Sequence, residues 1–82
     1  MKTIKQIIKD YYIQNGMSEQ QANKAYEYLV EQMKDTFNNF DSPMEQYSKM
    51  LQDLILLTAK QSAFEWLTIN KPEAWFISIF KS

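Results

Sequence analysis

Any chemistry in this chain has to come from serine, lysine and carboxylate side chains, because the sequence contains no histidine, cysteine or arginine. Lys60 and Ser62 stand two residues apart, and a neighbouring lysine can activate a serine hydroxyl for acyl transfer. Residues two apart on a helix do not face each other, so this pair is poorly placed. Paired carboxylates could act as general acid and base, but no spacing singles out such a pair. We therefore expect a protein that is not an enzyme.

The missing side chains also exclude the common metal and phosphate sites. Histidine is the commonest metal ligand, and di-iron sites in helical bundles pair glutamates with a Glu-x-x-His motif. The thiolate of cysteine and the bidentate guanidinium of arginine are equally absent. The single glycine, Gly16, cannot form a glycine-rich phosphate loop. The sequence thus predicts no cofactor and no metal, and a protein that works through its surface.

Aromatic side chains gather toward the C-terminal end of the chain. Trp66, Trp75, Phe76 and Phe80 belong to this group, together with Phe64. Tryptophan and phenylalanine are enriched at the centres of protein interfaces, so the first four are candidate partner-binding residues. The alternative is that these side chains close the core, where aromatic residues at helical spacing usually lie.

A second candidate surface is acidic. Glu27, Glu31 and Asp35 recur every four residues and would share one helix face. Like charges at this spacing oppose each other, and a basic partner would relieve that repulsion. The alternative is an ordinary solvated face, since Lys24 and Lys34 offset much of the negative charge.

A weaker reading concerns nucleic acid. Lys2, Lys5 and Lys9 form a short basic edge, and the segment from Ile8 to Ala25 resembles a helix-turn-helix, with Gly16 in the turn. Without arginine for guanine, and with acidic residues on the presumed recognition helix, nucleic acid is the less favoured partner. An ordinary helical hairpin explains the same segment.

Composition sets the scale of the fold. The 82 residues carry a net charge of −1 and are 45% hydrophobic, as expected of one globular domain spanning residues 1–82. A domain this small buries a modest core, so association with a second copy would stabilise it. The longest strongly apolar run, Leu54–Leu57, is far shorter than the ~20 residues that cross a bilayer. With no cysteine and no clear signal peptide, we expect a cytoplasmic protein that does not enter the membrane.

Capping signals divide the chain into helices. Thr3 with Gln6 and Ser18 with Gln21 match the capping box, and Gly16 between them can end the first helix. The apolar stripes are Ile4, Ile7, Ile8, Tyr11 and Tyr12 in the first helix, and Ala22, Ala25, Tyr26, Leu29, Met33 and Phe37 in the second. We expect the second helix to end near Asn38 and Asn39.

The third helix is expected to be the longest. Ser42 is a candidate N-cap and Pro43 suits the first helical position, so the helix should run from about Pro43 to Ile69. Around Leu54–Leu57 the helix is apolar on every side, which predicts a central, buried element. At about 27 residues it would measure about 40 Å, longer than the ~30 Å diameter of such a domain. Either it breaks near Thr58–Ser62, or its overhang packs on a second copy; we expect a homodimer.

The last segment is short and almost wholly apolar. Residues 70–73 contain Pro72 and form a boundary, after which 74–80 reads as a helix or, less favourably, a strand. The predicted fold is therefore an all-α bundle of three to four helices, with a long central third helix and a short aromatic C-terminal helix.

The predicted function is binding to another protein, with the aromatic residues as anchors and the acidic residues steering a basic partner. An adaptor, an inhibitor encoded by a phage or mobile element, and an immunity-like factor all fit this description, and the Lys-, Asn- and Ile-rich composition is typical of such elements. Two alternatives stay open: a dimeric helix-turn-helix-like DNA-binding regulator and a purely structural homo-oligomer.

Overall fold

A computed structural model describes residues 2–70, which form three α-helices and one short 3-10 helix. The elements are α1 (Ile4–Gln14), α2 (Glu19–Met33), η1 (Met44–Gln46) and α3 (Lys49–Asn70). All three α-helices contact one another. The predicted class, a small all-α bundle with a long third helix, is confirmed. The segment 74–80, predicted to be a helix or a strand, lies outside the described residues.

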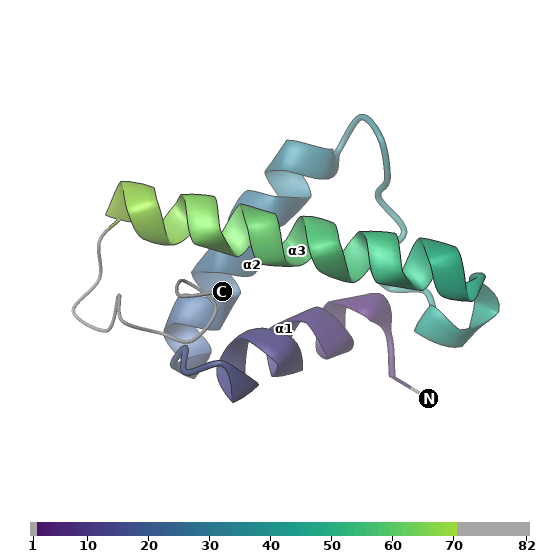
Figure 1. The fold of residues 1–82 in the computed structure, drawn as a ribbon, viewed down its shortest axis with the longest axis horizontal. Coiled ribbons are helices and arrows are strands. Elements are labelled where there is room, and N and C mark those ends of the chain that lie inside the picture. The colour runs from purple at the N-terminus through teal and green to yellow at the C-terminus, as the bar shows by residue number, and fades with distance from the viewer. Residues whose placement is uncertain (1, 71–82) are drawn as a thin grey trace.

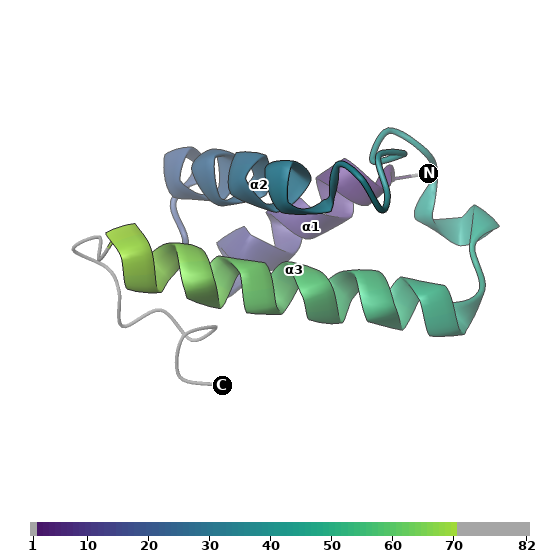
Figure 2. The same ribbon diagram turned by 90° about the horizontal axis from the view of Figure 1, so that it is seen from above.

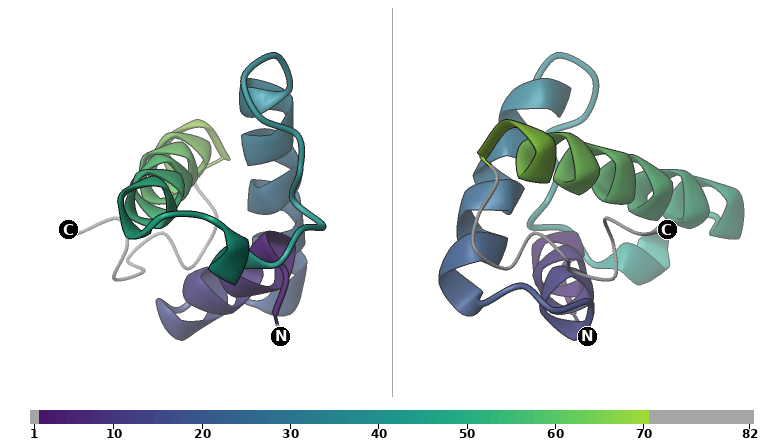
Figure 3. Two further views of the ribbon diagram at one scale, coloured as in Figure 1. Left: turned by 90° about the vertical axis from the view of Figure 1, so that its right-hand side faces the viewer. Right: turned by 60° about the vertical axis from the view of Figure 1, so that its left-hand side comes forward.

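The three helices are arranged with α3 along one side of the molecule. Figure 1 shows α2 crossing behind α3, while α1 runs in the same general direction as α3. Seen from above, both α1 and α2 lie on the same side of α3 (Figure 2). The end view of Figure 3 shows α2 standing steeply to α3, with α1 below them. One face of α3 is therefore turned away from α1 and α2.

Local sequence signals account for the first two helices. The predicted capping boxes are confirmed: the Gln6 backbone N–H donates to Thr3 Oγ1 (3.2 Å) and the Gln21 N–H to Ser18 Oγ (3.1 Å), and each glutamine side chain accepts in return. The apolar faces that these caps position are buried, with Ile4, Ile8 and Tyr12 from α1 and Ala22, Ala25, Tyr26 and Leu29 from α2. Capping and periodicity together place both stripes on the core.

Gly16 ends α1, as predicted. Its φ of 109° lies in the region that a glycine enters without steric cost. The Gly16 N–H donates to the Ile13 carbonyl (3.0 Å) and the Met17 N–H to the Tyr12 carbonyl (3.1 Å). These two bonds form a Schellman motif, which satisfies carbonyls at the helix end. Buried Met17 then places Ser18 for the start of α2.

The third helix begins six residues later than predicted. Pro43 has an extended backbone and forms an antiparallel bridge with Thr3, so it is the N-cap of the short η1 and not the first residue of α3. The carbonyl of Ser42 accepts the Ile4 N–H (2.9 Å), and the loop thereby satisfies a free donor at the start of α1. Ser48 caps α3 instead, accepting the Leu51 N–H at 3.2 Å. A tertiary contact has overridden the local signal at Ser42.

The second helix is also shorter than predicted, ending at Met33 rather than near residue 38. The chain turns there because Phe37 packs edge-on against Phe40 (5.1 Å between ring centroids) and Tyr47 (5.9 Å). Phe40 in turn packs edge-on against Tyr26 of α2 at 5.7 Å. These aromatic contacts fasten the loop between α2 and α3 to the core.

The length of α3 removes the conflict that the sequence suggested. At 22 residues it measures about 33 Å, and the longest extent of the molecule is 36 Å. The helix runs unbroken through Thr58–Ser62 and does not overhang. The expectation that Leu54–Leu57 is buried on every side is wrong, because Leu54 and Leu57 are exposed. Overhang therefore gives no argument for a dimer.

Candidate protein-binding face

The most prominent surface feature of residues 2–70 is an exposed apolar line on α3. Met50 is 82% exposed, Leu54 56% and Leu57 51%, and their spacing puts them on one face of the helix. The opposite face carries the core residues Ile55 and Ala59. A large apolar side chain exposed at every turn of a helix is the pattern of a surface that another apolar surface covers.

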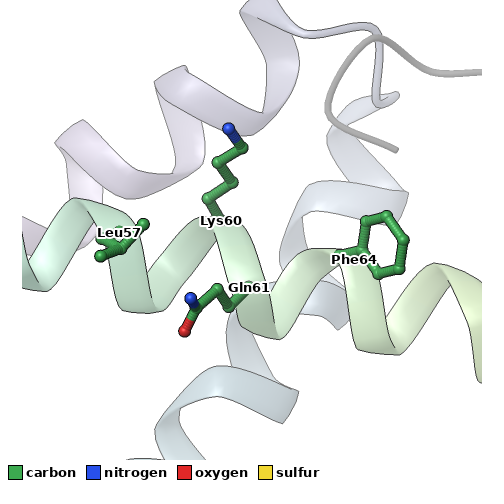
Figure 4. A pocket seen from close by; sticks show the side chains of 4 residues that line it. All are labelled: Leu57, Lys60, Gln61 and Phe64. Carbon is green, nitrogen blue, oxygen red and sulfur yellow. The ribbon is translucent and has the colours of Figure 1, made fainter. Parts of the chain in front are cut away.

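The line continues into a shallow hollow near the C-terminal half of α3. A depression of about 320 Å³ is lined by Leu57, Lys60, Gln61 and Phe64. In Figure 4, Lys60 points upward and Gln61 downward in the view, and both lie between Leu57 and Phe64. The hollow thus combines apolar ends with one amide and one ammonium group.

A groove borders the line on the α2 side. Its volume is about 430 Å³, and its walls come from the end of α2, the turn after it and α3. The lining residues are Gln32, Met33, Thr36, Phe37, Leu51, Leu54, Ile55 and Thr58. Leu54 belongs to both the line and the groove, so the apolar surface is continuous from α3 to α2. This continuous surface, the line Met50, Leu54 and Leu57 with its groove, is called the α3 face below.

Charged residues lie at the edges of the α3 face. Asp53 pairs with Lys49 at 2.8 Å, and both side chains are well exposed. An exposed pair of this kind contributes little stability, about 0.3–0.5 kcal/mol, so Asp53 remains available to another cation. Farther along α3, Glu65 accepts a hydrogen bond from the Tyr28 hydroxyl of α2. This bond raises the pKa of the Tyr28 phenol, because the proton is held by a carboxylate.

The predicted aromatic anchors divide into two groups. Trp66 is 7% exposed and lies in the core with Leu67 and Ala63, so the core alternative describes this residue. Trp75, Phe76 and Phe80 lie outside the described residues. Of the aromatic candidates, the structure therefore places only Trp66, and it places that side chain on the face of α3 opposite to the exposed line.

The predicted acidic stripe is only partly on a helix. Glu27 and Glu31 are exposed on α2, whereas Asp35 follows the helix end in a turn. Glu31 pairs with Lys34 at 2.9 Å. This ion pair agrees with the alternative of an ordinary solvated face, in which nearby lysines offset the negative charge. The three carboxylates therefore do not form one continuous helical stripe.

The basic edge is engaged within the fold. Lys2 pairs with Asp10 at 2.7 Å, and the ammonium groups of Lys5 and Lys9 lie 5.8 and 5.2 Å from the ring centroid of Tyr26. Cation–π contacts of this kind hold the two lysines against α2. The edge therefore does not present three free cations to a phosphate backbone.

The residues considered for catalysis or metal binding are not brought together. Ser62 is buried on the core side of α3, whereas Lys60 lines the outer hollow, so the two lie on different faces. Within residues 2–70, no group of three or more carboxylates is close enough to hold a metal ion. In the same range, no helix is long and apolar enough to cross a membrane.

Sequence reasoning missed Met50 and Leu57 as surface residues. It took the apolar run 54–57 as buried, because hydrophobicity on all sides usually marks a central helix. The sequence does contain a second row, from Met50 through Leu54 and Leu57 to Gln61 at intervals of four and three residues, beside the row through Ile55, but the spacing does not say which row is covered. A comparison with known proteins found no relative: no family model, no curated protein and no solved structure matches the chain.

Proposed function

We propose that this chain is a non-enzymatic binding module that attaches to another polypeptide chain through the α3 face. The observation that carries the proposal is the line Met50, Leu54 and Leu57, exposed on a helix whose opposite side is fully packed. Exposing three large apolar side chains in a row costs free energy in water, and a protein partner would recover it. Roles as an adaptor, an inhibitor or an immunity-like factor in the cytoplasm all use a face of this kind.

The groove beside the line supports the same proposal. Its walls are mainly apolar, with the polar groups of Gln32, Thr36 and Thr58 placed among them. Apolar walls with a few hydrogen-bonding groups are suited to receive a side chain from an amphipathic helix. By contrast, Lys2, Lys5 and Lys9 make contacts within the fold, so no observation favours the DNA-binding alternative.

Site-specific photo-crosslinking tests this proposal directly. A benzophenone amino acid is placed at position 57 on the α3 face and, as a matched control, at the exposed α2 position Gln20. Illumination of cells that produce the chain should give protein adducts from position 57 and none from position 20. Leu54→Ser in the same chain should abolish the adducts, because it removes the centre of the apolar line. If position 57 gives no adduct of any kind, the proposed function is wrong.

A further inference from the structure

The exposed line of α3 has the spacing of a coiled-coil seam. Met50, Leu54, Leu57 and Gln61 follow one another at intervals of four, three and four residues. This alternation is the a/d pattern through which two helices pack side by side. Leu54 and Gln61 take a positions, and Met50 and Leu57 take d positions. Over so short a length the seam needs no supercoil, because the drift of a straight helix is only ~20° per heptad.

The residues beside the seam carry opposite charges on one flank. Asp53 and Lys60 each precede an a position, so they take g positions and lie on the same side of the seam. The other flank holds Leu51 and Thr58 at e positions, and these two residues line the groove on the α2 side. In an antiparallel pair, g positions face g positions and e positions face e positions. One flank of such a pair is therefore charged and the other is nearly apolar.

The charges select one antiparallel register. With Leu54 opposite Leu57 of the partner subunit, Asp53 faces Lys60 of the partner subunit, and two-fold symmetry makes this contact twice. A shift of one heptad in one direction puts the two Lys60 side chains opposite each other. A shift in the other direction does the same for the two Asp53 side chains. Like charges at these positions oppose association, so only the first register is complementary.

A parallel pair uses the charges less well. In that arrangement g positions face e positions of the next heptad, which sets Asp53 against the uncharged Thr58. Lys60 would face Glu65, whose carboxylate already accepts the hydrogen bond of Tyr28. The antiparallel pair instead gives both Asp53 and Lys60 an opposite charge.

We propose that the occupant of the α3 face is a second copy of this chain, packed antiparallel with Leu54 opposite Leu57 and Asp53 opposite Lys60 of the partner subunit. The inference rests on the proposed function, because it names the polypeptide that covers the same face. A seam of four positions makes a small interface, and small interfaces belong to weak, exchanging complexes. The dimer is thus expected to dissociate on dilution.

Two charge reversals test the register. Asp53→Lys gives a chain with lysine at both g positions, and Lys60→Asp gives a chain with aspartate at both. Each variant alone should dimerise about tenfold more weakly than the native chain, because two attractive contacts become repulsive. An equimolar mixture should form a heterodimer at least as readily as the native chain forms its dimer, since opposite charges then meet at both contacts. Sedimentation velocity over a dilution series measures all three.

Two controls separate this effect from the fold. Lys49→Gln removes the Lys49–Asp53 ion pair within one chain but leaves the g positions unchanged, so it should dimerise as the native chain does. Circular dichroism of each charge variant should retain the native helical signal, because both positions lie outside the core. Leu57→Ser, which removes a d residue, should prevent association in any register.

The outcomes distinguish this inference from the proposed function. A native chain that sediments as a 9.8 kDa monomer at every concentration overturns the self-association. If it is monomeric and position 57 still crosslinks to a different protein, the proposed function stands and the second copy is excluded. If native dimers persist unchanged in Asp53→Lys, the antiparallel register is wrong. Absence of both self-association and adducts removes both proposals.

Discussion

The hydrogen bond from Tyr12 to Ala59 joins α1 to the middle of α3, and Tyr12→Phe removes it without removing the ring. The Tyr12 hydroxyl donates to the Ala59 carbonyl oxygen at 2.7 Å, and both residues are fully buried. This is a contact between residues 47 apart in sequence, so it reports on tertiary packing rather than on helix formation.

The expected loss of unfolding free energy depends on whether Tyr12→Phe leaves a buried polar group without a hydrogen-bond partner. Ala59 lies inside α3, so its carbonyl keeps a helical hydrogen bond when the phenol is lost. No buried group is left unpaired, and the cost is the net value of one hydrogen bond, about 1 kcal/mol of unfolding free energy. Truncating a buried aliphatic side chain such as Leu29→Ala should cost more, about 2–5 kcal/mol.

The same phenol links stability to pH. Burial raises the pKa of Tyr12 above its ordinary value near 10, because a phenolate would lose its hydration, and Tyr11 beside it adds to the shift. The unfolded chain then releases this proton at lower pH than the folded chain. The stabilisation is complete below pH ~10 and is lost as the pH rises beyond that value. Burial and Asp41 also raise the pKa of Tyr26 to about 12. Tyr26 is present both in the native chain and in Tyr12→Phe, so its effect cancels when their stabilities are compared.

Urea unfolding followed by circular dichroism measures the effect. At neutral pH, Tyr12→Phe should be less stable than the native chain by about 1 kcal/mol, and this difference should shrink above pH ~10. Tyr11→Phe is the matched control, since its hydroxyl does not bond to Ala59. Equal stability of Tyr12→Phe and native protein at neutral pH, with the same alkaline loss in both, would refute the reasoning.

Substitutions at three further positions test local features of the fold. Gly16→Ala should destabilise the chain by about 1–2 kcal/mol, because φ is 109° and a Cβ clashes there; thermal unfolding monitored by circular dichroism measures it. Ser18→Ala should cost about 1 kcal/mol through loss of the α2 cap, and Ser18→Asp should restore most of that stability in the same assay. Ser62→Ala should leave stability unchanged or raise it by up to about 1 kcal/mol, since the Ser62 Oγ has no hydrogen-bond partner among the described residues. A urea midpoint for Ser62→Ala below that of the native chain would mean that the hydroxyl has a partner.

Candidate sites were harder to predict than helices, because a side chain's role depends on what packs against it. Trp66 has the residue type of an interface anchor, yet it lies in the core beside Leu67. Leu54 has the residue type of a core leucine, yet it is more than half exposed. Hydrophobicity and period are the same in both settings, so the sequence could not distinguish a core position from an uncovered one.

The sequence by itself determined the caps at Thr3 and Ser18, the turn at Gly16 and the buried stripes of α1 and α2. Each of these features depends on residues within a few positions of one another, so all the residues that determine it can be read from a short stretch of sequence. Tertiary structure decided where α3 begins, because the Ser42 carbonyl bonds to the start of α1 rather than opening a helix. It also decided which side of α3 meets water: α1 and α2 both pack on one side, and that placement leaves the apolar line from Met50 to Leu57 uncovered by either helix.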